Sequence, residues 1–160
     1  MERIKIFYFI PNLAQGGTER QLLRLIASLP ERYEPVLCLY HDKVFYDRDL
    51  PAGQPKYVLG TETMDLAALQ RLTDILKQER PHIVHSYRDK ANFWARVAAL
   101  RAGVPVIVTS CRNRMMEPRH LLVEKVLSDR CQAVLTNSEG VRQELIRRAR
   151  VRPDKVRVIY

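Results

Sequence analysis

The sequence predicts an α/β fold of the Rossmann-like, doubly wound type, in which helices cover both faces of a mainly parallel sheet. Short runs of β-branched and aromatic residues recur throughout the 160 residues. Segments with apolar residues at helical spacing separate these runs, and glycine or proline marks most of the boundaries. Strands that alternate with helices are typical of a parallel sheet built from right-handed crossovers, so we expect one domain of this kind.

The first strand leads into a loop that contains two glycines. Residues 4–10 form an apolar run that predicts a buried strand, and Pro11 ends it. Gly16 and Gly17 follow. Because glycine readily adopts positive φ, these two residues predict a flexible loop that a ligand can approach closely. A tight turn that simply needs glycine is the alternative interpretation.

A capping signal predicts the first helix. Thr18 is a suitable N-cap, and Gln21 three residues later completes a capping box. Leucine and isoleucine then recur at helical spacing until Pro30 ends the pattern.

The same signals place the remaining elements. Further strands are expected at residues 33–40, 56–59, 82–85, 104–109, 133–136 and 156–159. Further helices are expected between the cap Asp65 and Pro81, at residues 89–102, at residues 117–128, and from the cap Ser138 to about residue 150. The polar residues 42–55, which include two prolines and a glycine, predict a loop.

The chain is basic, with a formal net charge of +9 from 27 Lys and Arg against 18 Asp and Glu. This balance favours anionic partners, namely nucleic acid, phosphorylated ligands or an acidic membrane surface, although a merely basic soluble surface explains it equally well. The three cysteines form no C-x-x-C pair, so we expect reduced thiols in the cytoplasm rather than zinc or redox chemistry. We expect neither a signal peptide nor a membrane-spanning segment.

Four loops follow the carboxyl ends of expected strands, which is where ligands bind in open parallel sheets. They are residues 11–18, 86–92, 110–116 and 137–140. In the first loop, free amides at a helix N-terminus favour a phosphate group. The signatures of a P-loop, a dinucleotide site and a serine-hydrolase elbow are missing, as is an H-x-x-x-H metal pattern.

The second and third loops carry polar and ionisable side chains. His85 alone is best explained as a core histidine, whereas Tyr87, Arg88 and Asn92 are better placed to face a cleft. Arg112 in the third loop can hold phosphate or carboxylate through bidentate contacts, with a solvated basic loop as the alternative. The fourth loop most simply caps the helix that follows it.

Taken together, these segments resemble the retaining glycosyltransferases of family 4, also called group 1, over essentially the whole chain. Residues 16–19 (Gly-Gly-Thr-Glu) are similar to that family's G-G-A/T-E loop, and residues 81–86 to its P-D-I/V-V-H-x-H strand. Residues 102–105 resemble its A-G-V-P segment, while residues 137–138 and 154–160 resemble the strand end and the D-K-I/V-x-V-I-x segment before its interdomain linker. Each motif alone is weak, but five in this order are specific.

The resemblance implies the N-terminal, acceptor-side half of a GT-B enzyme. Such an enzyme moves a sugar from a nucleotide-diphosphate sugar to an acceptor, retains the anomeric configuration and needs no metal ion. The glycine loop would then reach the donor diphosphate through Gly16, Gly17 and Thr18. The candidate acceptor-binding residues are Asn12, Tyr87, Arg88, Asn92, Arg112 and Asn113.

Two positions depart from the family pattern. Tyr87 stands where the family often has the second histidine of V-H-x-H, and Arg112 is the candidate to replace a later histidine near the transferred sugar. The sequence also ends at Tyr160, where the family's interdomain linker begins. We therefore expect residues 1–160 to be the acceptor-side domain, with the donor-binding domain and its acidic pair outside this sequence.

The expected partners are a nucleotide sugar and a glycan or lipid-linked acceptor, as in bacterial cell-surface polysaccharide or glycolipid synthesis. The basic charge fits peripheral attachment to the cytoplasmic face of an anionic membrane. Two other interpretations stay open: a basic Rossmann-like module that binds nucleic acid or another polyanion without catalysis, and an epimerase-like GT-B protein. No nucleic-acid motif supports the first, and the Gly-Gly-Thr-Glu loop argues against the second.

Overall fold

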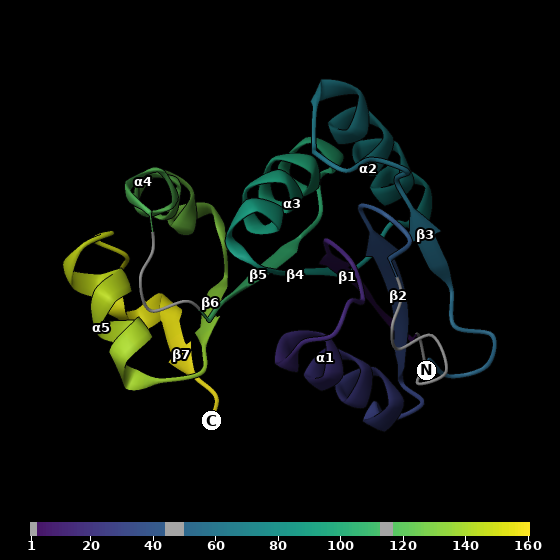
Figure 1. Ribbon diagram of the computed structural model, residues 1–160, viewed down its shortest axis with the longest axis horizontal. Coiled ribbons are helices and arrows are strands. Elements are labelled where there is room, and N and C mark those ends of the chain that lie inside the picture. The colour runs from purple at the N-terminus through teal and green to yellow at the C-terminus, as the bar shows by residue number, and fades with distance from the viewer. Residues whose placement is uncertain (1–2, 44–49, 113–116) are drawn as a thin grey trace.

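The computed structural model describes residues 3–43, 50–112 and 117–160 (Figure 1). The strands in these ranges are β1 (Ile4–Ile10), β2 (Tyr33–Leu39), β3 (Lys56–Val58), β4 (Ile83–Tyr87), β5 (Val106–Cys111), β6 (Ala133–Thr136) and β7 (Val156–Val158). The helices are α1 (Gly17–Ser28), α2 (Leu66–Glu79), α3 (Asp89–Ala102), α4 (Pro118–Leu127) and α5 (Glu139–Arg147), with short 3-10 turns η2 (Ser128–Arg130) and η3 (Pro153–Lys155).

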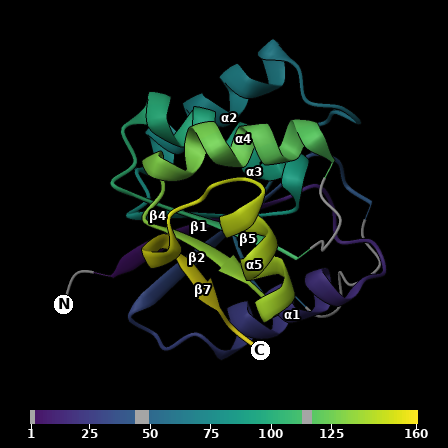
Figure 2. The ribbon, with the colours of Figure 1, turned by 90° about the vertical axis from the view of Figure 1, so that its left-hand side faces the viewer.

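Within the described residues, seven parallel strands form one sheet in the order β3-β2-β1-β4-β5-β6-β7. Helix α1 lies against one face of the sheet, and α2, α3 and α4 lie against the other (Figures 1 and 2). Leu121 of α4 and Leu145 of α5 share a core cluster with Val134 and Val156 of the last two strands. The predicted doubly wound fold is thus confirmed.

The central strand β1 divides the core in two. Phe7 and Phe9 pack into the cluster under α2 and α3, whereas Ile6, Tyr8 and Ile10 pack into the cluster under α1. This division follows from the two-residue period of a strand, which sends successive side chains to opposite faces. Both faces of β1 are therefore apolar, as the unbroken run of residues 4–10 predicted.

Several element boundaries differ from the expectation by one to three residues. The strands expected at 82–85 and 104–109 each start one or two residues later and end two residues later, at Ile83–Tyr87 and Val106–Cys111, because their polar ends pair in the ladder between β4 and β5. Helix α5 ends at Arg147 rather than near residue 150. By contrast, Asp89–Ala102 and Ala133–Thr136 have the predicted bounds.

Two of the three predicted helix caps are confirmed. The Asp65 carboxylate accepts a hydrogen bond from Ala68 N at 2.7 Å, and the Ser138 hydroxyl accepts one from Val141 N at 3.3 Å. The predicted capping box at Thr18 is wrong, because α1 begins at Gly17 and its N-cap is Gly16, which has no side chain to cap with.

The cysteines and the helix lengths can be compared with the expectation. Cys38, Cys111 and Cys131 are buried and free. In the part of the chain that the structure describes, no helix is long and apolar enough to cross a membrane.

Candidate functional site

The polar residues of the predicted loops meet at the carboxyl edge of the sheet. The chain runs outward from β1 to one side and from β4 to the other, so the boundary between β1 and β4 is the topological switch point where such sheets bind ligands. A cavity of about 530 Å³ opens beside it. Its lining residues are Pro11, Asn12, Ala14, Gln15, Glu19, Tyr40, His41, Glu62, Arg88, Asp89, Lys90, Glu117 and His120.

The glycine loop owes its glycine to a carboxylate and not to backbone strain. Gly16 is extended, with φ of −172°, and Gly17 also lacks a positive φ, so the loop does not use the positive φ that its glycines permit. A Cβ on Gly16 would overlap Oε2 of Glu19 and lie 3.0 Å from its Cδ. A Cβ on Gly17 would meet nothing within 4 Å. A side chain at position 16 would therefore have to displace the Glu19 carboxylate, whereas position 17 has room for one.

The N-terminus of α1 is available to an anion. The first helical hydrogen bond runs from Arg20 N to Gly16 O at 3.2 Å, so the amides of Gly17, Thr18 and Glu19 precede the helical ladder. Gly17 is exposed and Thr18 is half-buried. Free amides and the positive end of a helix dipole favour an anion, so the phosphate contact expected of Gly16, Gly17 and Thr18 stays a prediction at this position.

A buried carboxylate and a strained arginine connect this loop to the loop after β4. Arg88 donates from Nη1 to Oε1 of Glu19 at 3.0 Å, with the Glu19 side chain 3% exposed and that of Arg88 56% exposed. Arg88 is also the N-cap of α3, with φ of 78°. A non-glycine residue in that region carries strain of about 1–3 kcal/mol, which persists mainly at functional sites.

His85 belongs to a buried polar cluster rather than to the cavity. Its Nε2 lies 2.9 Å from Ser110 Oγ, and its ring stacks on Tyr87 with centroids 4.4 Å apart. The Arg112 guanidinium carbon lies 5.6 Å from the Tyr87 ring centroid, and Arg112 donates to Oε1 of Gln21 on α1. Burial, aided by Arg112, lowers the pKa of His85 to about 3, so this imidazole is neutral.

Asn92 is a structural link between strands. Its Oδ1 accepts from the Ser86 hydroxyl at 2.8 Å, and its Nδ2 donates to the Ser110 carbonyl at 3.0 Å. The side chain is fully buried, so the expectation that Asn92 faces a cleft does not hold. Its amide instead holds together the carboxyl ends of β4 and β5.

The structure gathers part of the predicted set. Asn12 and Arg88 line the cavity, with Asn12 Oδ1 accepting from Ala14 N at 2.9 Å. Arg112 lies beside α1, whereas Tyr87 is buried beneath it and offers a ring face to Arg112 rather than to a cleft. Asn113 lies outside the described residues.

Several cavity residues were not predicted from the sequence. His41 Nε2 lies 3.4 Å from Glu62 Oε2, and His120 Nδ1 lies 3.8 Å from Asp89 Oδ2. Of these unpredicted residues, only Glu19 could have been proposed from the sequence, because it stands in the first turn of a helix that follows a glycine loop. Among the described residues, no three His, Cys, Asp or Glu side chains gather so as to hold a metal ion.

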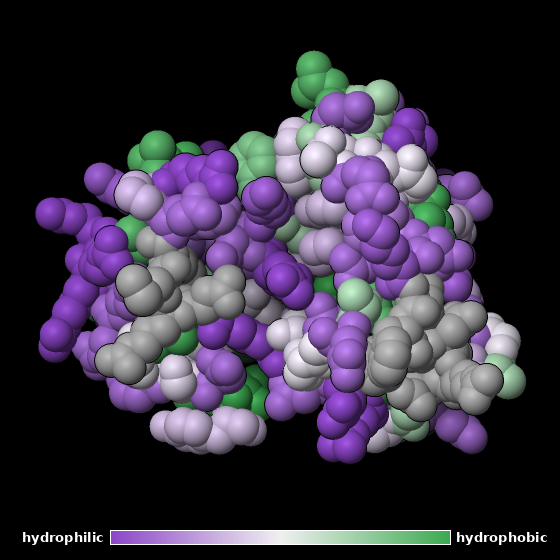
Figure 3. Space-filling model, in the orientation of Figure 1, coloured by the Kyte–Doolittle hydropathy of each residue, from purple (hydrophilic) through white to green (hydrophobic). Residues whose placement is uncertain are grey.

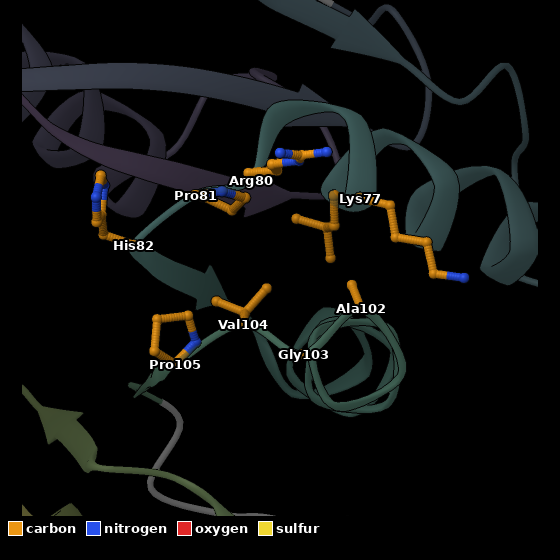
Figure 4. Close-up of a pocket in the computed structure, with 9 residues that line it drawn as sticks. Lys77, Arg80, Pro81, His82, Ala102, Gly103, Val104 and Pro105 are labelled. Carbon is orange, nitrogen blue, oxygen red and sulfur yellow. The ribbon is translucent and has the colours of Figure 1, made fainter.

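A second cavity of about 480 Å³ lies at the opposite, amino edge of the sheet. Figure 4 shows Pro81 and His82 across from Val104 and Pro105, with Arg80 above them. Pro81 and His82, which begin the motif at 81–86, therefore meet the motif at 102–105 where α2 and α3 end. We interpret them as structural, because ligands in open parallel sheets bind at the carboxyl edge.

Comparisons with known proteins agree with this architecture. The model of a family described as Glycosyltransferase Family 4 matches residues 15–160. The Anabaena protein HepE in complex with UDP and glucose superposes with a TM-score of 0.81 at 18% identity, covering 99% of this chain and 44% of HepE. The UDP-GlcNAc 2-epimerase of Methanocaldococcus jannaschii, in complex with UDP-GlcNAc and UDP, gives a TM-score of 0.71 at 16% identity, covering 98% of this chain and 46% of the epimerase.

The epimerase of Neisseria meningitidis bound to UDP-GlcNAc gives a TM-score of 0.68 at 16% identity, covering 97% of this chain and 45% of that enzyme. A search of curated proteins by sequence gives no match. At these identities the structural likeness establishes the fold alone. The chain spans less than half the length of each of these proteins.

Proposed function

The chain belongs to glycosyltransferase family 4, and from this membership we propose that it is the acceptor-side half of an enzyme that transfers a sugar from a nucleotide-diphosphate sugar to a glycan or lipid-linked acceptor. The observation that carries the proposal is the N-terminus of α1 at the switch point, with Gly16 closely packed against Glu19 and with Arg88 and Arg112 beside the same helix. The family match favours transfer over epimerisation, although epimerases share the fold.

The proposed role of the α1 N-terminus is to stabilise the donor diphosphate. Negative charge grows on the leaving diphosphate as its bond to the sugar breaks, and preorganised amides together with a cation lower the energy of that state. The amides of Gly17 and Thr18 precede the helical ladder. Arg88 is already paired with Glu19, whereas the contacts of Arg112 among the described residues are with the neutral Gln21 and the Tyr87 ring, so Arg112 is the better-suited cation.

The proposed role of the cavity is to bind the acceptor. It presents hydrogen-bond donors and acceptors close together, among them Asn12, His41, Glu62 and His120. Sugar hydroxyl groups both donate and accept, so such a mixed lining suits a glycan. The retaining, metal-free course of the reaction and the acidic pair expected in the donor-binding half are part of the same proposal.

Transfer by the protein as its gene encodes it tests the proposal. Release of nucleoside diphosphate from a panel of nucleotide sugars, with glycan and lipid-linked acceptors, should be measured by a coupled assay, and the anomeric configuration of the product by NMR. We expect turnover with retention. An absence of acceptor-dependent release from every donor would contradict the proposal. For the 160-residue chain alone we expect little or no turnover, and robust turnover would overturn that expectation.

A further inference from the structure

Helix α4 buries an acidic side chain and exposes apolar ones, the reverse of what a helix that only covers a sheet would do. Glu124 is 2% exposed, and its Oε2 accepts a hydrogen bond from Arg96 Nη2 at 2.6 Å inside the core. Leu122 and Val126, four residues apart on the outward side, are 61% and 62% exposed. A helix that only packs on a sheet buries its apolar stripe. The outward apolar pair of α4 is therefore a surface that suits a partner.

An apolar groove of about 270 Å³ lies beside this pair, between α3 and α4. It is lined by Lys90, Phe93, Trp94, Arg119, His120 and Val123. The rings of Phe93 and Trp94 meet edge to face with centroids 5.0 Å apart. Tryptophan combines an apolar body with a polar N–H and favours the boundary between hydrocarbon and water.

Basic side chains surround the apolar surface. The exposed basic residues of α3, α4 and η2 are Lys90, Arg101, Arg119, Lys125 and Arg130. The exposed acidic residue of these elements is Asp129, and Glu117, just before α4, pairs with Arg119 at 2.5 Å. In Figure 3, hydrophobic atoms emerge among hydrophilic ones along the outer side of the layer that contains α2, α3 and α4. Apolar groups ringed by cations complement an anionic bilayer.

We propose that the outer face of α3 and α4 docks this protein on an anionic phospholipid bilayer. Leu122 and Val126 enter the boundary between head groups and acyl chains, and Trp94 lies at that boundary. Arg119 and Lys125 contact lipid phosphates. Docking of this kind is peripheral, because it uses one helical face and no spanning segment.

Docking on this face places the candidate site at the membrane. Lys90 and His120 line both the apolar groove and the polar cavity, so the two are adjacent. A lipid-linked acceptor in the bilayer would then present its head group to the cavity. This consequence rests on the proposed glycosyl transfer, whereas the docking itself does not.

Vesicle binding by the 160-residue chain tests docking without any transfer reaction. The vesicles are phosphatidylcholine alone or phosphatidylcholine with an equal amount of phosphatidylglycerol. Trp94 is the only tryptophan of the chain, so its fluorescence reports directly on the proposed face. We expect co-sedimentation and a blue shift of this emission with the anionic vesicles only, and quenching by brominated acyl chains. No binding, or equal binding to both vesicles, would overturn the proposal.

Matched variants separate this face from general charge attraction. Arg119→Gln with Lys125→Gln removes two positive charges from α4, and Arg24→Gln with Arg147→Gln removes two from exposed positions of α1 and α5. We expect the first pair to weaken binding by roughly tenfold or more and the second to weaken it little. Leu122→Gln with Val126→Gln should also lose binding, whereas Leu25→Gln on α1 should not. Equal losses of vesicle binding in the two double charge variants would refute docking through this specific face. Failure of the transfer assay, with vesicle binding intact, would count against the proposed function alone.

Discussion

Arg88 and Glu19 join the loop after β4 to the first turn of α1 through a single ion pair of 3.0 Å. The arrangement is asymmetric, because the Glu19 side chain is 3% exposed and that of Arg88 is 56% exposed. The buried carboxylate lies so close to Gly16 that a Cβ there would have to displace it. The ion pair, the strained backbone of Arg88 and the glycine loop therefore form one unit, and a change at any of the three should affect the N-terminus of α1.

Gly16→Ala should damage the site while Gly17→Ala should not. The new Cβ at position 16 must displace the Glu19 carboxylate and with it Arg88, whereas the Cβ at position 17 meets nothing within 4 Å. In the full enzyme we expect kcat/KM for the donor to fall by at least about tenfold for Gly16→Ala, since misplaced amides stabilise the leaving diphosphate less well. Steady-state kinetics of both variants provide the test, and equal kinetics for the two would contradict the role given to Gly16.

Arg88→Gly should be more stable than Arg88→Ala. Both changes remove the guanidinium, but only glycine relieves the strain at φ of 78°, so we expect glycine to be the more stable by about 1–2 kcal/mol. At Arg71, an exposed position within α2, the order should reverse, because glycine costs about 1 kcal/mol relative to alanine in a helix. Urea unfolding of the four variants measures both differences. If the Arg88→Ala variant unfolds with the same free energy as the Arg88→Gly variant, the backbone at position 88 is not strained.

Local sequence signals were sufficient where neighbouring residues decide the structure. The bounds of α3 follow from a helical pattern that ends at Gly103, which takes φ of 72° as the C-cap. The caps Asp65 and Ser138 followed from the same kind of signal. The doubly wound parallel sheet followed from the alternation of strands and helices together with the handedness of crossovers.

The sequence could not reveal contacts between distant segments. Thr18 was a good local cap, but Gly16 holds that place because Glu19 packs against it and pairs with Arg88, 69 positions away. Asn92 resembled a cleft residue until the ladder of β4 and β5 buried it. Likewise, only a buried arginine from another helix explains why α4 turns its acidic residue inward.

Glu124→Ala should destabilise the chain far more than Asp154→Ala. The Arg96–Glu124 pair is almost entirely buried at 2.6 Å, and removing the carboxylate leaves a buried guanidinium unpaired, at a cost of about 3–5 kcal/mol. The Arg152–Asp154 pair has a similar length of 2.8 Å, but both side chains are over 60% exposed, so its loss should barely change the free energy of unfolding. Chemical unfolding followed by circular dichroism decides the matter. Similar decreases in the free energy of unfolding for the two variants would show that burial does not strengthen the Arg96–Glu124 pair.

His85 should make the stability of the chain depend on pH above the range of the carboxylates. Its pKa is lowered to about 3 in the folded state by burial and by Arg112, from an ordinary value near 6.5. Between these values the unfolded chain binds the proton and the folded chain does not, so the free energy of unfolding falls as the pH falls, by up to about 1.4 kcal/mol per pH unit. The stabilising neutral state is fully present above about pH 6.5.

Urea unfolding between pH 7 and 5 should show this slope in the native chain and a much flatter one in His85→Gln, which keeps a hydrogen-bonding partner for Ser110. His120→Gln removes a histidine from the same edge of the sheet and should keep the slope. A slope that survives in His85→Gln would mean that another group is responsible.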